Sequence, residues 1–277
     1  MKFGFVTCVQ LGLSCIEEIY NIGGQLDVVI TLKDEKAKSK SGRIYLDDIS
    51  SKHSIPLFKI NHINDKETID LIKSFELDWL FIIGWSQIAS NEVLESVKYG
   101  CVGMHPTLLP LGRGRAAIPW AIIKGLDKTG VSMFKLDEGV DTGDILGQVE
   151  IELDDKMTST VLYNLVDQAH ITLIKNVFPT MANDKVKLVE QDNSLATYWE
   201  GRTPKDGEIN KEMTVVEVDR LVRATTKPYP GAFFRDGDKK VIVWSTSFVD
   251  KVDLESISFK LRDGFLIPQE YDIVDNE

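Results

Sequence analysis

The sequence predicts an α/β protein with a Rossmann-like, mostly parallel sheet in residues 1–182 and a smaller β-rich domain in residues 183–277. Short apolar runs alternate with amphipathic segments from the first residues onward, which is typical of βαβ units with right-handed crossovers. A long helical pattern over residues 158–181 closes the first domain. Beyond it, short β-favouring runs between Gly and Asp turns replace the alternation and indicate a domain of a different class.

Strand-like and helix-like segments follow one another through the first domain. The polar, basic run 33–43 is expected to be a solvated loop, and a place beside an anionic ligand is the secondary interpretation. His170 lies just off the apolar stripe of the long helix, so we expect it at the surface. The expected strands are 2–7, 26–32, 55–58, 78–83, 102–105, 129–136 and 145–153, and the expected helices are 11–22, 44–53, 66–75, 91–94 and 117–124.

The second domain is expected to hold short strands and one helix. Thr214 and Glu217 form a capping-box pattern, which predicts a helix that begins there and runs to about residue 225. The run 228–231, Pro-Tyr-Pro-Gly, would end that helix. The expected strands are 186–189, 241–245 and 256–260.

Composition and charge exclude several classes of function. The 277 residues are 43% hydrophobic and carry a formal net charge of −11, so the overall field repels polyanions. A nucleic-acid partner would therefore need a local basic patch, and we expect no nucleic-acid partner. Residues 8–12 contain a single glycine after the first strand, which leaves a nicotinamide-dinucleotide site without support.

The cysteines and the N-terminus indicate a cytoplasmic protein. Cys8, Cys15 and Cys101 occur without CxxC spacing or a Cys/His cluster, so we expect reduced, buried thiols and no metal site. The first residues lead straight into a strand-like run without a cleavage site, and no apolar stretch reaches membrane-spanning length. We therefore expect a soluble protein with no membrane partner.

The chemistry is expected in the region from residue 100 to residue 146. His105 ends a short apolar strand, and Pro106 prevents that strand from continuing, so the imidazole should point out of the sheet. Asp141 lies in a later loop with Gly139 and Gly143, which suits close backbone approach to a ligand. A histidine with a carboxylate indicates general-base chemistry with an orienting partner, although unrelated surface or capping residues would show the same pattern.

Blocks of residues in this region resemble the formyltetrahydrofolate-dependent formyltransferases, in order and at the spacing of that family. The resemblance covers most of residues 1–181. Weaker similarity at residues 202–207 and 228–233 resembles members that formylate nucleotide-linked amino sugars, including the branch that makes pseudaminic and other nonulosonic acid precursors. The main blocks are residues 105–110 (HPTLLP), 113–114 (RG), 119–122 (PWAI), 129–131 (TGV) and 141–146 (DTGDIL).

The resemblance implies the formyltransferase fold and an N-formyltransferase that uses 10-formyltetrahydrofolate as co-substrate, without a metal. It implies His105 and Asp141 as catalytic residues. His105 would accept the amine proton or donate to the formyl oxygen, while Asp141 fixes the orientation of the ring. Backbone groups would hold the pterin at Trp85, Ser86, Gln87, Ile88, Leu136, Gly139, Val140 and Asp141.

One departure from the family pattern concerns the oxyanion. The family usually carries Asn-x-His, with the Asn amide binding the formyl oxygen, whereas this chain has Gly103 two residues before His105. Loss of an oxyanion donor typically costs about 10²–10³-fold in rate, so a replacement is expected. A backbone N–H, a water in the space at Gly103, or the amide of Gln87 are the candidates.

The expected substrate is a nucleotide-linked amino deoxysugar, formylated for surface-glycan or nonulosonic acid biosynthesis. Arg113 and Arg115, beside the catalytic loop, are candidates for binding an anionic substrate. Polar and aromatic groups further along could meet the base and diphosphate, although turn formation and interdomain packing explain the tyrosines equally well. The resemblance also suggests a homodimer. These further substrate candidates are Tyr198, Arg202, Asp206 and Tyr229.

Alternative functions remain open at this point. A methionyl-tRNA formyltransferase would need a basic stripe, but the C-terminal region mixes basic residues with at least as many acids. Glycinamide ribonucleotide formyltransferase activity needs no second domain, and a formyltetrahydrofolate hydrolase would use water in place of the amine. A folate-binding protein without catalysis is a different class, and the retained His105 and Asp141 argue against it.

Overall fold

The computed structural model describes residues 1–37, 43–251 and 257–275. The chain folds into two compact units, and neither is a continuous segment. The predicted domain of residues 183–277 contains most of unit 2, but unit 2 also takes in two earlier segments. Unit 1 comprises Met1–Arg113, Gly130–Ile151 and Val166–Tyr198, and unit 2 comprises Gly114–Thr129, Glu152–Leu165 and Trp199–Glu277.

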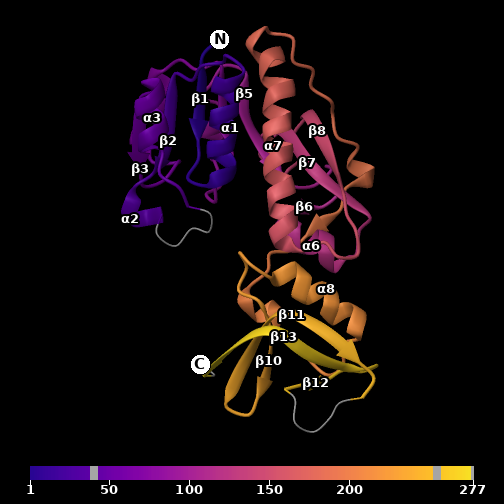
Figure 1. Ribbon diagram of the computed structural model, residues 1–277. Coiled ribbons are helices and arrows are strands. Elements are labelled where there is room, and N and C mark those ends of the chain that lie inside the picture. Colours follow the sequence, from indigo (N-terminus) through magenta and orange to yellow (C-terminus); the bar gives the residue numbers. More distant parts are fainter. Residues whose placement is uncertain (38–42, 252–256, 276–277) are drawn as a thin grey trace. The chain divides into compact units, whose positions relative to one another are not determined.

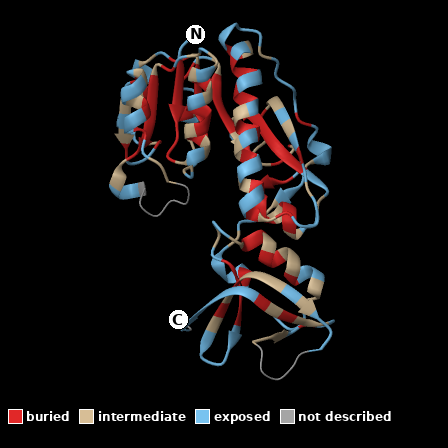
Figure 2. Cartoon of the chain, viewed as in Figure 1, coloured by how far each residue is buried: buried red, intermediate tan, exposed pale blue. Residues whose placement is uncertain are grey.

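A seven-stranded sheet forms the centre of the larger part, which confirms the predicted α/β class (Figure 1). Five neighbouring strands are parallel, whereas the sixth runs antiparallel to its neighbour. The strands beside the centre are buried on both faces, as their continuous apolar runs require (Figure 2). In spatial order the strands are β3 (Leu57–Ile60), β2 (Val28–Leu32), β1 (Phe3–Val6), β4 (Trp79–Ile82), β5 (Gly100–His105), β7 (Lys128–Lys135) and β8 (Ile145–Glu152).

Helices connect these strands and cover the sheet. The first helix starts close to β1, because Gly12 has no side chain and Thr7 fills the space beside it; a Cβ would lie 2.0 Å from the Thr7 hydroxyl oxygen. Residues 34–37 of the predicted basic loop form a short helix, and residues 38–42 of that loop lie outside the described residues. The helices are α1 (Gln10–Asn21), α2 (Asp34–Ala37), α3 (Asp47–His53), α4 (Lys66–Ser74), α5 (Asn91–Leu94) and α7 (Ser159–Ala182).

Unit 2 has a four-stranded antiparallel sheet with its own apolar core. Val218 and Val222 of its helix pack with Phe234 and Val243 of the sheet in that core. The predicted strand at residues 186–189 is reduced to a single bridge between Val189 and Ile145. The elements of unit 2 are α6 (Ala117–Ile123), α8 (Val215–Thr225), β10 (Ala232–Asp236), β11 (Lys239–Val249), β12 (Phe259–Lys260) and β13 (Phe265–Asp275). A separate two-stranded sheet joins β6 (Arg113–Gly114) and β9 (Tyr198–Trp199), and each of these strands has its first residue in unit 1 and its second in unit 2.

The capping box predicted at the start of α8 is present. The Thr214 hydroxyl accepts from the Glu217 N–H at 3.2 Å, and the Glu217 carboxylate accepts from the Thr214 N–H at 2.7 Å. The bonds that the Glu217 carboxylate accepts from the Thr214 N–H and hydroxyl lower the pKa of Glu217. Two backbone donors that a helix start leaves without partners are therefore satisfied reciprocally.

The three cysteines are free and buried, as expected. Burial raises the pKa of Cys101 to about 12 and also raises that of Cys15, so neither is a thiolate at neutral pH. Within the described ranges no cluster of His, Cys, Asp and Glu has the arrangement of a metal site. Over the same ranges no helix is both long and apolar enough to cross a membrane.

His170 is buried, which corrects the expectation that it lies at the surface. Its ring is 2% exposed on α7, and Nδ1 lies 2.7 Å from the carbonyl oxygen of Val166. The carbonyl can only accept, so Nδ1 carries the hydrogen. Burial lowers the pKa of His170 to about 4. Ile174 is buried as well, so the packed face of the helix is wider than the predicted apolar stripe and includes His170.

We expect His170 to make the protein less stable in acid. The unfolded chain binds this proton near pH 6.5 and the folded protein only near pH 4, so the free energy of unfolding falls as the pH drops between these values. The contribution of this one residue is roughly 3 kcal/mol. His170→Gln should reduce the slope of unfolding free energy against pH in urea titrations, whereas His62→Gln, at an exposed position, should not. Equal slopes for wild type and His170→Gln would contradict the assignment.

Candidate functional site

The side chain of His105 is held between two oxygen atoms at the carboxyl end of β5. Its Nε2 lies 2.8 Å from the carbonyl oxygen of Gly112, and its Nδ1 lies 3.6 Å from a carboxylate oxygen of Asp141. The residue is only 8% exposed. The carbonyl accepts, so Nε2 carries a hydrogen, and a second hydrogen on Nδ1 would face the carboxylate. The structure thus brings together the two residues that the sequence singled out for catalysis.

The loop that carries Asp141 is tightly braced. Asp141 has a φ of 56°, a left-handed conformation that is unusual for a residue with a side chain. Asp137 holds the loop from inside, because its carboxylate accepts from the Gly139 N–H at 3.1 Å and the Thr142 hydroxyl at 2.7 Å. At Gly143 a Cβ would lie 1.8 Å from the Lys135 carbonyl oxygen, so only glycine allows the turn to close.

Gly103, the position of the departure from the family pattern, is filled by a neighbour. A Cβ at Gly103 would lie 2.8 Å from Cδ2 of Leu136. Leu136 follows β7 directly, and its backbone N–H donates to the carbonyl of Cys101 at 2.8 Å. Apolar side-chain atoms of Leu136 therefore occupy space that a side chain at residue 103 would need.

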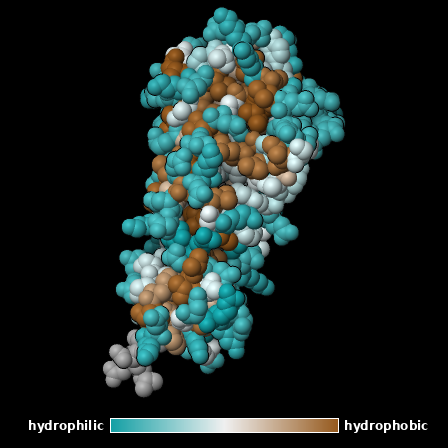
Figure 3. Space-filling model, turned by 90° about the vertical axis from the view of Figure 1, so that its right-hand side faces the viewer, coloured by the Kyte–Doolittle hydropathy of each residue, from teal (hydrophilic) through white to brown (hydrophobic). Residues whose placement is uncertain are grey.

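The residues predicted to hold the pterin lie in the loops after β4 and β7, and their chemistry fits a flat ligand with a polar edge. The indole N–H of Trp85 is buried, and no described residue accepts from it. Ile88 is 87% exposed and Val140 is also exposed, so both loops present apolar side chains. The two regions are joined by a 2.7 Å hydrogen bond from the Asn91 amide to Glu138. Hydrophobic residues gather in the upper part of the face shown in Figure 3.

Both ends of the Gln87 side-chain amide bond to nearby backbone groups. The side-chain oxygen accepts from the Ile63 N–H at 2.8 Å, and the side-chain nitrogen donates to the carbonyl of Asn61 at 3.1 Å. The nitrogen carries two hydrogens, so the bond to Asn61 leaves one of them for a further acceptor. In this structure Gln87 supports the loop after β4.

Arg113 is buried, contrary to the expectation that it meets an anionic substrate. It is 1% exposed, and its guanidinium donates to neutral acceptors on Gln191, Asn193 and Tyr198 at 2.7 to 3.2 Å. No carboxylate pairs with it in the described part of the chain. Its donors are used by the protein, so we assign it a structural role.

The other substrate candidates divide between the two units. In unit 1, Tyr198 is exposed, and its hydroxyl accepts from Arg113. In unit 2, Arg202 lies over the Trp120 ring and donates to the Asp206 carbonyl at 2.6 Å, and burial lowers its pKa. Arg115 is exposed.

Asp206 and Tyr229 are each engaged in local structure. The Asp206 carboxylate accepts from the backbone and hydroxyl of Thr203, which lowers its pKa. Tyr229 is half-buried, and burial raises its pKa to about 12, so its phenol is neutral at physiological pH. Their substrate roles remain predictions.

Two residues of this site were not found from the sequence. Gly112 supplies the oxygen against His105 Nε2, and Gln191 donates to the carbonyls of Asp141 and Gly143. Gln191 stands in a polar stretch between elements and carries no sequence signal of burial, although it is 4% exposed. Only the fold shows that this stretch returns to the Asp141 loop.

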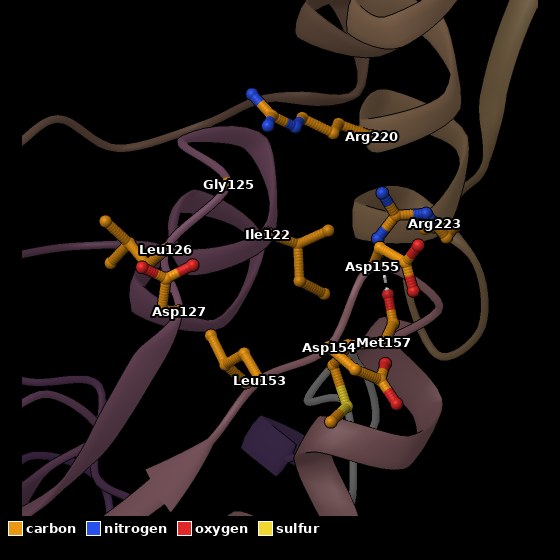
Figure 4. Close-up of a pocket in the computed structure, with 10 residues that line it drawn as sticks. All are labelled: Ile122, Gly125, Leu126, Asp127, Leu153, Asp154, Asp155, Met157, Arg220 and Arg223. Atoms are coloured by element: carbon orange, nitrogen blue, oxygen red, sulfur yellow. Dashed lines mark hydrogen bonds between the residues drawn. The ribbon is translucent and has the colours of Figure 1, made fainter.

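Unit 2 contains a cavity of about 160 Å³ near the end of α6, and it holds none of the predicted site residues. Arg223 lines one side and donates to the Met157 carbonyl oxygen at 2.8 Å (Figure 4). Its guanidinium also bonds the Asp219 carboxylate. Arg220 lies across Gly125, where a Cβ would be 2.3 Å from the guanidinium carbon. We assign no function to this cavity.

Comparison with known proteins identifies both parts of the chain. Residues 13–177 match the formyl transferase family model, and residues 202–264 match the formyl transferase C-terminal domain. The bifunctional polymyxin resistance protein ArnA of Wigglesworthia glossinidia brevipalpis is 32% identical over 92% of this chain, which spans 38% of that protein's length. Methionyl-tRNA formyltransferase of Clostridioides difficile is 29% identical over 93% of this chain and 84% of its own length.

Solved structures share the fold along the whole chain. A sugar N-formyltransferase from Shewanella superposes with a TM-score of 0.71 at 19% identity, over 91% of this chain and 99% of its own. The N-formyltransferase from Helicobacter canadensis, solved with folinic acid and dTDP-3-aminofucose, gives 0.69 at 17%, over 99% and 98%. Methionyl-tRNA formyltransferase from Clostridium thermocellum gives 0.64 at 20%, over 100% of both chains.

Gly103→Asn introduces the Asn-x-His pattern of the family. We expect this substitution to destabilise the protein. The new Cβ meets Leu136, and overpacking of this kind costs about 1–3 kcal/mol. Leu136→Ala removes that neighbour. In the double variant Gly103→Asn/Leu136→Ala, the loss of unfolding free energy should therefore be smaller than the sum of the losses in the two single variants. A double-mutant cycle of urea unfolding checks this. Additive losses would contradict the contact between residues 103 and 136.

Proposed function

The chain belongs to the formyl transferase family, and we propose that it transfers a formyl group from 10-formyltetrahydrofolate to the primary amine of a nucleotide-linked amino deoxysugar. The observation that carries the proposal is the pairing of His105 with Asp141 at 3.6 Å in a braced loop. Such a pair supplies what amine formylation needs, a group that moves a proton and a carboxylate that orients it.

The proposed chemistry follows from the protein groups present. When bound, the folate supplies the activated formyl group. An attacking amine must lose a proton, and charge develops on the formyl oxygen. His105 donates to that oxygen through its Nε2–H, or, with the ring hydrogen on Nδ1 toward Asp141, accepts the amine proton at Nε2. In either case the ring exchanges its bond to Gly112 for one to substrate. Asp141 keeps the ring oriented and stabilises its charged form through the ion pair.

Charge supports a sugar nucleotide as the acceptor over a transfer RNA. The net charge is −11, and residues 199–277 carry 12 Lys and Arg against 16 Asp and Glu. A protein that reads RNA needs a basic surface to neutralise phosphates. Arg115 and Arg202 would meet the two charges of a single diphosphate, with Tyr198, Asp206 and Tyr229 as further contacts. We place the activity in glycan or nonulosonic acid biosynthesis, in a cytoplasmic homodimer.

A second candidate function is methionyl-tRNA formylation. The relative from Clostridioides difficile favours it, because the match includes 84% of that protein. A folate-binding protein without catalysis is the third candidate, and Gly103 in place of the family's Asn is the feature that favours it.

A substrate screen tests the proposal directly. The purified protein is incubated with 10-formyltetrahydrofolate and a panel of UDP-, dTDP- and GDP-linked amino sugars, with methionyl-tRNA in parallel. We expect mass spectrometry to show one added formyl group on at least one sugar. Formylation of the tRNA alone would replace the proposal with the second candidate. Absence of any product, together with folate binding measured by calorimetry, would support the third candidate, a folate-binding protein without catalysis.

His105→Ala is expected to abolish transfer while the fold remains intact, because the ring is the group that we assign to proton transfer beside Asp141. Loss of a positioned acid–base group lowers the rate by about 10²–10⁴-fold. Rates come from the assay above, and circular dichroism and urea unfolding check the fold. His62→Ala serves as the control at an exposed histidine. Substantial residual turnover in His105→Ala would contradict the assignment.

A further inference from the structure

We propose that Gln191 is a positioning residue for this reaction: it clamps the turn of residues 141–143 so that the carboxylate of Asp141 faces His105, and Arg113 fixes Gln191 in turn. The inference rests on the proposed function for its catalytic consequence. Its structural basis is a closed ring of contacts within unit 1, from His105 through Gly112 to the adjacent Arg113, and through Gln191 back to Asp141.

The orientation of the Gln191 amide is set by Arg113. A guanidinium has only donors, so it must face the amide oxygen and not the amide nitrogen. Arg113 Nε and Nη2 both donate to Gln191 Oε1, at 3.2 and 2.7 Å. With both residues buried, a flipped amide would place N–H groups against a buried positive charge. The amide nitrogen therefore points toward the Asp141 loop.

That nitrogen bonds both sides of the turn. Gln191 Nε2 lies 2.9 Å from the Asp141 carbonyl oxygen and 2.7 Å from the Gly143 carbonyl oxygen. These bonds use both hydrogens of the amide. Asp141 adopts a φ of 56°, and such a conformation persists only where surrounding contacts enforce it. Without Gln191 the carbonyls of Asp141 and Gly143 would each lose a donor, and the turn would lose its outer clamp.

The same guanidinium offers a matched control. Asn193 Oδ1 accepts from Arg113 Nη2 at 2.8 Å, and in the described part of the chain no hydrogen bond joins Asn193 to the Asp141 loop. Asn193→Asp and Gln191→Glu both replace an amide with a carboxylate beside Arg113. Only Gln191→Glu removes the two donors to the turn, so the pair separates added charge from lost positioning.

The first readout does not require activity. In protein labelled with ¹³C at histidine Cε1, the His105 signal is identified by its absence in His105→Ala. We expect Gln191→Glu to shift this signal, and Gln191→Leu to do the same without a charge, while Asn193→Asp leaves it in place. An unchanged His105 signal in both Gln191 variants, or an equal shift in Asn193→Asp, would overturn the proposal.

The second readout is the split between kcat and KM, with the amino sugar found by the substrate screen. A displaced catalytic group lowers kcat by about 10- to 100-fold, whereas KM for the sugar should change by less than about twofold. Asn193→Asp should retain wild-type kcat. Wild-type kcat in the folded Gln191→Glu protein overturns the proposal. If wild type formylates nothing, the proposed function fails, and the histidine signals still decide whether Gln191 positions Asp141.

Discussion

The contact of the His105 ring with two oxygens from different loops is the constraint on which the rest of the site depends. Gly112 lies on the loop that follows β5, and Asp141 lies on the loop that follows β7. A ring held at both nitrogens has one orientation, so each loop must be placed independently and accurately. This explains why backbone groups are so closely packed there, with a glycine against the Lys135 carbonyl and a carboxylate inside the turn.

Much of the fold and the centre of the site could be predicted because the relevant signals are local. Alternating apolar runs predict parallel strands, and a histidine stopped by Pro106 predicts a side chain at the end of a strand. Periodicity carries no information on strand direction, so the antiparallel orientation of β7 was not foreseen. The sequence also gives no signal that Arg113 is buried, because the acceptors that satisfy its guanidinium lie about 80 residues further along the chain.

The position of Leu136 affects how the absence of the family's asparagine is interpreted. A glycine at residue 103 would suggest an empty place, but a neighbouring leucine lies against it. The departure from the family pattern is therefore a pair of residues that fit one another. In the proposed reaction, the group that stabilises the developing charge would work beside an apolar side chain, where the low local dielectric strengthens each remaining donor.

The chain passes between the two units five times, at residues 113/114, 129/130, 151/152, 165/166 and 198/199. No single cut in the gene separates them, so the C-terminal segment is not a module that recombination can exchange intact. A segment acquired from a relative would arrive without α6 and the start of α7, which belong to the same unit. In such an architecture a change in the C-terminal segment has to remain compatible with α6 and with the start of α7.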